Sequence, residues 1–118
     1  MTVVLKLKKR KDFLRVAKQG QKMVTSTVIL QAAQSLSAPE QNPKTGFTTT
    51  RKIGKAHIRN RTRRRIREVY RLNEEKFQPG WDIVVVARTK AVDAPFEKLV
   101  RSYLNLARKA GILIEGTE

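Results

Sequence analysis

The sequence predicts a small domain of mixed α and β structure (α+β class), on the basis of three observations. Residues 23–33 are rich in β-branched side chains and residues 83–87 form a continuous apolar run, both typical of strands. Residues 57–71 and 96–110 instead repeat their apolar side chains with the period of a helix. With 118 residues and a hydrophobic content of 40%, the chain can bury one core, so we expect a single domain over residues 1–118.

The elements are expected in the order helix, three strands, helix, strand and helix, with about four strands in the sheet. Their bounds are a helix over 12–18, one or two strands within 23–33, a strand over 45–51, a helix over 57–71, a strand over 83–87 and a helix over 96–110. Gly20 ends the first helix, and Ser, Pro and Asn residues between positions 37 and 43 mark a loop. Residues 1–11 form a basic arm, which could be flexible, and residues 112–118 form a short tail.

The two longer helices each have one apolar face. In the last helix, Leu99, Tyr103 and Leu106 share about half of the helical wheel, and Gly111 follows as a terminating residue. In the helix over 57–71, the apolar arc covers about 120° and should pack on the sheet. Its members are Ile58, Thr62, Ile66, Val69 and Tyr70. In the strand over 45–51, alternation places Phe47 and Thr49 on one face and Gly46, Thr48 and Thr50 on the other.

The formal net charge of +16 is concentrated in two segments of the chain. Residues 1–22 contribute +7 and residues 51–71 contribute +9, so the remainder of the chain is neutral. A uniformly basic surface would indicate solubility, whereas two concentrated patches indicate sites that meet a polyanion. Nucleic acid is therefore the leading candidate for a partner.

The denser patch lies on the helix over 57–71, which has seven arginines in thirteen positions. Its outward ridge consists of Asn60, Arg64, Arg67 and Arg71, with Arg61 and Arg63 on either side. Arginines in the first turns oppose the positive end of the helix macrodipole, at about 0.3–1 kcal/mol each, and a bound phosphate would reverse that cost. Because only Glu68 could pair with this face, we interpret it as a polyanion site and not as a solvated helix face.

The sequence lacks the groups that a protein nuclease uses. It has no cysteine, a single histidine (His57) and no P-loop motif. Glu74 and Glu75 are expected in a solvent-facing turn, and Asp82 is expected to cap or pair locally. The longest apolar run is five residues, against the about 20 that span a bilayer, and the N-terminus lacks a secretion signal. We expect a cytoplasmic protein without catalytic or metal-ligating residues.

The segment from Gly46 to Tyr70, centred on Arg59-Asn60-Arg61, resembles the signature of the bacterial ribonuclease P protein component. Asp12-Phe13, Gly20 and residues 82–88 agree with that family in order and spacing, so the resemblance covers about residues 8–110. It implies a two-layer α/β sandwich, similar to the second domain of a small-subunit ribosomal protein. In that fold, the arginine helix makes a left-handed crossover between two parallel strands.

The resemblance also implies a function. The family joins a catalytic RNA, and the complex acts as an endoribonuclease that removes the 5′ leader of precursor tRNA, with Mg²⁺ held mainly by the RNA. The implied partners are thus the ribonuclease P RNA and precursor tRNA, with no membrane and no obligate protein partner. The catalytic groups are expected in the RNA, which agrees with their absence from this sequence.

Two sets of site residues follow by matching position. The RNA subunit would contact Arg51, Lys52, Arg59, Asn60, Arg61, Arg63, Arg64 and Arg67. The leader would contact Phe13, Ala17, Ile29, Gln31, Thr48, Thr50 and Arg88. Ala17 and Gln31 stand where family members often carry aromatic residues, so leader contacts should be weaker or depend more on hydrogen bonds. Phe13 could equally be a core residue beneath the first helix.

Two other classes of protein remain open on sequence grounds. A structural RNA-binding protein of the ribosomal type would share the charge, the size and the absence of catalytic residues. Such proteins more often carry long basic tails, whereas residues 112–118 are short and mildly acidic. An autonomous metal-dependent nuclease is the third alternative, and the missing carboxylate cluster argues against it.

Overall fold

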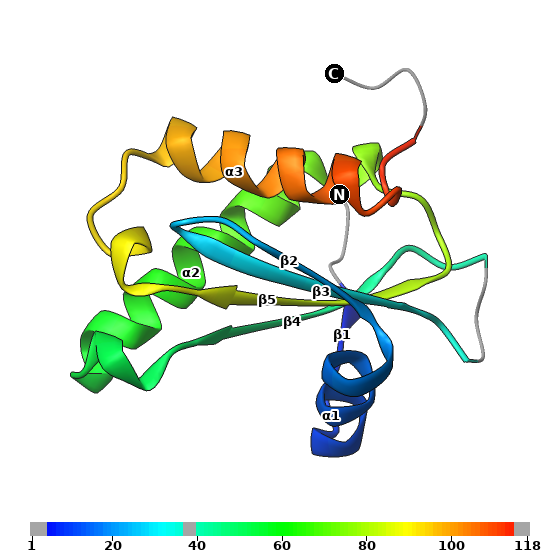
Figure 1. The fold of residues 1–118 in the computed structure, drawn as a ribbon, viewed down its shortest axis with the longest axis horizontal. Helices are drawn as coiled ribbons and strands as arrows, with labels where there is room; N and C mark the ends of the chain where they lie inside the picture. The colour runs from blue at the N-terminus through cyan, green and yellow to red at the C-terminus, as the bar shows by residue number, and fades with distance from the viewer. Residues whose placement is uncertain (1–4, 37–39, 115–118) are drawn as a thin grey trace.

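The computed structural model describes residues 5–36 and 40–114, which form one sheet and three α-helices (Figure 1). In chain order the elements are β1 (Leu5–Lys6), α1 (Arg10–Gln19), β2 (Gln21–Val24), β3 (Val28–Gln34), β4 (Lys44–Thr49), α2 (Ala56–Asn73), β5 (Trp81–Ala87) and α3 (Phe96–Lys109). Three short 3₁₀ turns lie between them, η1 (Arg51–Ile53), η2 (Glu74–Lys76) and η3 (Thr89–Ala91). Gly111 adopts a φ of 76° and follows α3, as predicted for a helix-ending glycine.

The predicted α+β class and the order of the six main segments are confirmed, and the number of strands is not. The sheet has five strands instead of about four, because Leu5–Lys6 within the basic arm pairs with β4. Two residues are too few to produce a periodic pattern, so this strand has no signal in the sequence. Residues 23–33 contribute to two strands, β2 and β3, which pair as an antiparallel hairpin.

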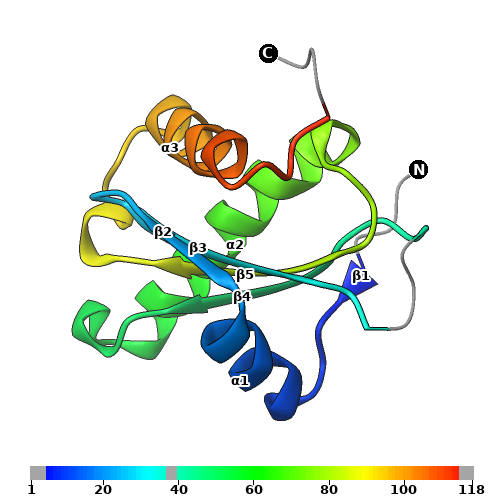
Figure 2. The ribbon, with the colours of Figure 1, turned by 45° about the vertical axis from the view of Figure 1, so that its right-hand side comes forward.

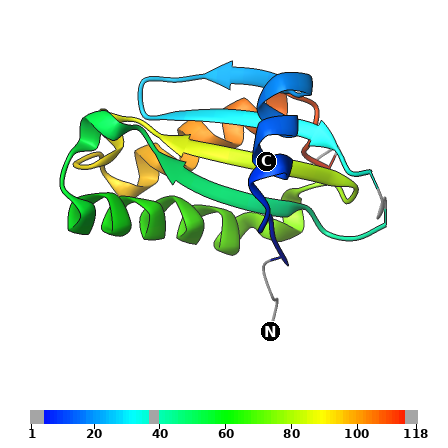
Figure 3. The same ribbon diagram turned by 90° about the horizontal axis from the view of Figure 1, so that it is seen from below.

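The strand order is β1-β4-β5-β3-β2, so the last strand of the chain occupies the centre of the sheet. β4 and β5 are parallel neighbours, and α2 connects them. In the view from below, β4 and β5 run in the same direction and α2 lies behind the sheet, which makes the crossover left-handed (Figure 3). Nearly all βαβ crossovers are right-handed.

The helices divide between the two faces of the sheet (Figures 1 and 2). α2 and α3 cover one face, where Ile66 and Leu99 pack with Leu30 and Val85 in the main core. α1 lies alone on the other face, where Val16 packs on Ala33 and Val84 in a smaller cluster. The two-layer description therefore fits the α2 and α3 side, and α1 adds a single helix that leaves much of the second face uncovered.

Two contacts fix α1 to the sheet. The Arg15 guanidinium forms an ion pair with Asp82 on β5, and both side chains are largely buried. At the end of α1, a Cβ on Gly20 would lie 2.5 Å from the carbonyl oxygens of Val16 and Ala32, so only glycine allows this close approach. The expectation that Asp82 caps or pairs locally is wrong, because its partner is 67 residues away in the chain.

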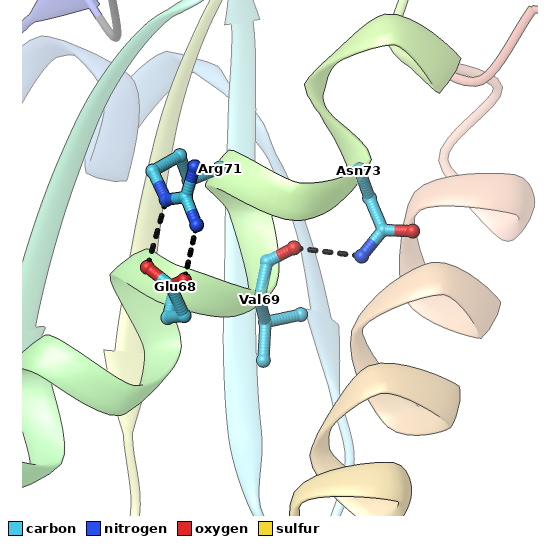
Figure 4. A network of polar contacts seen from close by, with 4 residues as sticks. All are labelled: Glu68, Val69, Arg71 and Asn73. Atoms are coloured by element: carbon cyan, nitrogen blue, oxygen red, sulfur yellow. Dashed lines mark hydrogen bonds and ion pairs between the residues drawn. The ribbon is translucent and has the colours of Figure 1, made fainter.

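The C-terminal end of α2 is the part of the fold where the sequence-based prediction fails most clearly. The Asn73 side chain donates a hydrogen bond to the Val69 carbonyl at 2.8 Å, one turn back (Figure 4). Glu74 follows and is only 4% exposed, whereas Glu75 is exposed. Glu74 was expected in a solvent-facing turn. Instead, the 3₁₀ turn η2 directs it toward the core, near Tyr70.

Burial raises the pKa of the Glu74 carboxyl above its ordinary value of 4.5, and the nearby Tyr70 hydroxyl lowers it by less. The folded state thus favours the protonated carboxyl, and the associated stability is lost as the pH rises through the folded-state pKa. Glu74→Gln should therefore raise the free energy of unfolding at pH 7 by about 1 kcal/mol and have little effect near pH 4.

Chemical denaturation of the wild type and the variant between pH 4 and pH 8 measures this difference. Glu75→Gln is the matched control, since it removes the same charge from an exposed neighbouring position. Identical pH profiles for the Glu74 variant and the wild type would show that the carboxyl is ionised in the fold without cost.

Candidate RNA interface

The ridge predicted on α2 faces away from the sheet. Thr62, Ile66, Val69 and Tyr70 are buried, and Ile58 at the start of the arc is half-buried. Asn60, Arg61, Arg64 and Arg67, on other sides of the helix, are exposed, whereas Arg59 and Arg63 are half-buried. Because the apolar arc is held in the core, the orientation of the arginines is set by packing.

The loop before α2 brings further positive groups to the start of the helix. Gly54 has a φ of 90°, a conformation that favours glycine, and turns the chain between η1 and α2. Lys55 is the N-cap of α2 and makes no side-chain capping hydrogen bond. Arg51 and Lys52 are exposed on η1. Uncapped amides and these cations make the start of α2 attractive to an anion.

Several side chains on the ridge are held by neighbours within the chain. The Arg63 guanidinium donates a hydrogen bond to the Asn60 side-chain oxygen, and the Arg67 guanidinium lies 5.9 Å from the centre of the Phe47 ring. These residues and Arg64 line a shallow hollow that contains no carboxylate. Arg71, at the end of the ridge, is different, because it pairs with Glu68 through hydrogen bonds of 2.9 and 2.5 Å (Figure 4).

Arg65 is an arginine of α2 whose hydrogen bonds all serve the fold, a role that was not predicted from the sequence. Its guanidinium donates hydrogen bonds to the carbonyls of Ala91 at 2.7 Å and Val92 at 3.0 Å, and also to that of Ala94. It thereby ties the middle of α2 to the segment that follows β5. On the helical wheel it lies about 20° from Ile58, at the margin of the buried arc, and this position was the available signal.

A second set of predicted residues lies on the face of the sheet that carries α1. The strand register places Val86 between Ile29 on β3 and Thr48 on β4, and it places Val84 between Gln31 and Gly46. All of these side chains share the face on which Val16 packs, as the predicted alternation requires. Ile29, Gln31 and Thr48 are half-buried, so they remain accessible beside α1.

Phe13 and Ala17 border this face from α1. Phe13 is half-buried and packs against the smaller core cluster, and its ring lies so close to Gly46 that a Cβ there would collide with it. It is therefore both a packing residue and an accessible one. Ala17 is exposed and, as an alanine, provides no second aromatic ring next to that of Phe13. We call the accessible strip formed by Phe13, Ala17, Ile29, Gln31 and Thr48 the groove.

The groove and the start of α2 meet at one end of the sheet. A hollow there is lined by Ser26, Ile29, Thr50, Arg51, Lys52, Arg88, Thr89 and Lys90. The backbone places Thr50 and Arg88 together, because the Thr50 amide donates to the Ala87 carbonyl at 3.0 Å. Arg88 in turn donates to the Thr25 carbonyl at 2.8 Å. The hollow contains four cationic residues and no acidic residue, and it is lined by members of both predicted sets.

The carboxylates of the described residues are paired, buried or dispersed. Asp82 pairs with Arg15, Glu68 pairs with Arg71, and Glu74 is buried. Within the described residues, no three His, Cys, Asp or Glu side chains gather in a group that could hold a metal ion. None of the helices among these residues is long and apolar enough to cross a membrane.

The fold and these cationic hollows define a small α+β protein of the polyanion-binding class. Comparison with known proteins identifies its family. Residues 1–111 match the family model described as Ribonuclease P. The chain is 38% identical over 109 residues to the ribonuclease P protein component of Clostridioides difficile (strain 630), covering 92% of this chain and 93% of the relative. The same protein of Gluconacetobacter diazotrophicus is 41% identical over 109 residues, with 91% of each chain covered.

Solved structures of ribonuclease P proteins have the same fold as this chain. The ribonuclease P protein of Thermotoga maritima superposes with a TM-score of 0.77 at 30% identity, over 94% of this chain and 98% of that one. A ribonuclease P protein of Staphylococcus aureus has a TM-score of 0.80 over 95% of this chain and 100% of that one, and at 23% identity it supports the fold alone. The chain belongs to the ribonuclease P protein component family, the protein subunit of a ribonucleoprotein endoribonuclease whose catalysis lies in the RNA.

The exposed part of the ridge can be tested by removing two charges. Arg64→Ala combined with Arg67→Ala should weaken RNA binding and reduce its salt dependence by roughly two ion equivalents, since log affinity falls by about 0.7–0.9 per phosphate neutralised. Titration of ribonuclease P RNA at several salt concentrations gives the slope. Arg101→Ala with Arg108→Ala on α3 is the charge-matched control, and an equal loss of slope in both variants would contradict a specific role for the ridge.

Arg65→Ala should lower the stability of the protein without changing the salt dependence of RNA binding. The variant loses hydrogen bonds to three backbone carbonyls, so we expect the free energy of unfolding to fall by about 2–4 kcal/mol. The salt slope of RNA binding, measured below the melting temperature, should stay close to that of the wild type. A stable Arg65 variant with a reduced salt slope would instead place this guanidinium on RNA.

Proposed function

We propose that this protein binds the catalytic RNA of ribonuclease P through α2 and its preceding loop, and binds the 5′ leader of precursor tRNA in the groove. The complex then removes the leader by Mg²⁺-dependent hydrolysis. One observation carries the proposal: a single hollow is lined by Ile29, Thr50 and Arg88 of the proposed leader set and by Arg51 and Lys52 of the proposed RNA-subunit set. A leader strand in the groove can therefore end next to RNA that is bound at the loop before α2.

The ridge suits the sugar-phosphate backbone of a folded RNA. Guanidinium groups make bidentate hydrogen bonds to phosphate oxygens, and Arg64 and Arg67 are exposed on adjacent turns. Arg51 and Lys52 extend the same positive surface around the start of α2. Arg59, Asn60, Arg61 and Arg63 complete the proposed contact with the RNA subunit.

The groove suits a single strand. It contains one aromatic ring, from Phe13, on which a base can stack, and the remaining side chains are aliphatic, hydroxyl or amide groups. Without rings at Ala17 and Gln31, the strand depends more on hydrogen bonds from Gln31, Thr48 and Thr50 and on the charge of Arg88. We therefore expect modest affinity per leader nucleotide.

The chemistry of the reaction belongs to the RNA in this proposal. Mg²⁺ ions, bound mainly by RNA phosphates, supply the activated water and stabilise the leaving oxygen. The described protein residues contribute binding and orientation, because their acidic side chains are buried, paired or dispersed. We place the complex in the cytoplasm and expect it to need no further protein.

Reconstitution tests the proposed function. The protein is mixed with ribonuclease P RNA and labelled precursor tRNA at a Mg²⁺ concentration too low for the RNA alone, and cleavage at the 5′ end of the tRNA should be stimulated. Cleavage without the RNA would indicate an autonomous nuclease. Binding to RNA without stimulation would indicate a structural RNA-binding protein of the ribosomal type.

The same assay tests the groove. Phe13→Ala should weaken binding of a precursor with a long leader by about 1–3 kcal/mol, the contribution of one stacked base, and should leave a one-nucleotide leader unaffected. Leu14→Ala is the matched control, because Leu14 is 57% exposed on the same helix and lies outside the proposed contact. Equal losses for both leader lengths would place Phe13 in the core and not on the leader.

A further inference from the structure

A third basic hollow lies on the other side of α1 from the groove. It is bounded by residues 5–9, the first two turns of α1 and the starts of β4 and β5. We call it the arm hollow. Its lining includes Lys8, Lys9, Lys11 and Lys44. Neither the proposed ridge nor the proposed groove contains any of these four lysines.

α1 separates the arm hollow from the groove. Figure 3 shows α1 crossing in front of the strands, with open sheet to one side of it and the starts of β4 and β5 to the other. Lys44 is the first residue of β4, whereas Thr50 at the end of the groove lies six residues further along. At about 3.3 Å per residue, Lys44 and Thr50 are roughly 20 Å apart, and α1 lies between the arm hollow and that end of the groove. The arm hollow is thus a separate location on the molecule.

The arm that borders the hollow is anchored to the sheet. The Leu7 amide donates to the Thr45 carbonyl at 3.0 Å, and the Thr45 hydroxyl donates to the Leu5 carbonyl at 3.1 Å. The Leu7 side chain is buried with Val16 and Val84. Lys8 and Lys9 therefore follow a fixed strand, so a ligand bound there need not order a loose tail, and less conformational entropy is lost on binding.

The charges of the hollow are not balanced within the described residues. Its lining contains five lysines, Arg15 and the carboxylates of Asp12 and Asp82. Arg15 and Asp82 neutralise each other in their ion pair, and no ion pair joins a lysine of the hollow to a described carboxylate. Asp12 is then the only carboxylate opposing five ammonium groups in the described lining. An anion would relieve this repulsion.

Stability does not account for the placement of these lysines. On α3, Glu97 lies in the first turn and Arg108 and Lys109 in the last, which is the arrangement that favours a helix. α1 follows the same arrangement with Asp12 in its first turn and Lys18 in its last. Four further cations, Lys8, Lys9, Arg10 and Lys11, nevertheless lie around the positive end of its dipole, where they oppose it. Lysines can also protect the edge of a sheet from pairing with another chain, and β1 is an edge strand. Loss of edge protection would cause self-association of the protein, whereas loss of an RNA contact would reduce the salt dependence of RNA binding.

We propose that the arm hollow binds a phosphate-bearing segment of RNA, as a contact separate from the ridge and from the groove. This inference rests on the proposed function, since the RNA is supplied by the ribonucleoprotein or by its substrate. The group that the hollow would recognise is the phosphodiester backbone, which both possible RNAs carry. A segment of the catalytic RNA and a segment of precursor tRNA are its two possible sources, and they can be separated by titration.

The test compares two triple variants that remove the same charge. Lys8→Gln, Lys11→Gln and Lys44→Gln alter the arm hollow, and Lys98→Gln, Arg101→Gln and Lys109→Gln alter the outer face of α3. Each protein is titrated with ribonuclease P RNA, and each reconstituted complex is titrated with precursor tRNA, at several salt concentrations. Thermal melting confirms that both variants are folded.

The arm variant should lose roughly two to three ion equivalents of salt dependence in one of the two titrations, and the α3 variant should lose less than one. A loss with ribonuclease P RNA assigns the contact to the RNA subunit, and a loss only with precursor tRNA assigns it to the substrate. Unchanged slopes in both titrations would overturn the proposal. Self-association of the free arm variant with unchanged slopes would also overturn it, in favour of edge protection.

A variant of opposite charge gives an independent check. Asp12→Asn removes the one unpaired carboxylate of the hollow, so RNA binding should tighten and its salt slope should steepen by about one. Equal or weaker binding would count against the proposal. If the wild-type protein fails to bind ribonuclease P RNA or to stimulate cleavage, the proposed function itself fails, whatever the variants do.

Discussion

The burial of the apolar arc of α2 is the interaction on which the rest of the structure depends. Tyr70 is fully buried and contacts Phe47 and Phe77, at ring-centre distances of 6.1 and 5.0 Å, and Phe77 continues to Tyr103 on α3. This row of rings joins β4, α2, η2 and α3 through apolar contacts. Because the arc faces inward, the remaining circumference of α2 must face solvent, and it is there that the exposed arginines lie.

Periodicity was sufficient to predict this arrangement, because each position on a long helix has a defined direction relative to its neighbours. For Arg65 it indicates only a position at the margin of the buried arc, and not the partners, which are carbonyls 26 to 29 residues away in the chain. Nor could it find β1 or the pairing of Arg15 with Asp82, since both depend on segments brought together only by the fold. Strand alternation predicted the shared face of Thr48 and Gly46, whereas the grouping of the groove residues came from family resemblance.

In the folded protein, the positive charge lies on both faces of the sheet. The two basic segments of the sequence lie on opposite faces of the sheet, with the N-terminal segment around α1 and the other on α2. At the end of the sheet, a hollow joins Ile29, on the face that carries α1, to Arg51 and Lys52 of the second segment, and Arg88 adds a further cation there. A surface that extends around two faces suits a partner that encloses the protein more than one that touches a single side.

The central position of β5 has a consequence for how the chain acquires its structure. β4 pairs only with β1 and β5, and β3 pairs only with β2 and β5, so residues up to 80 form two separate two-stranded pieces. Such pieces are marginal in water until a third strand joins them. During synthesis, the sheet cannot assemble before residues 81–87 leave the ribosome. Folding should therefore be a late, cooperative event, with no stable N-terminal intermediate.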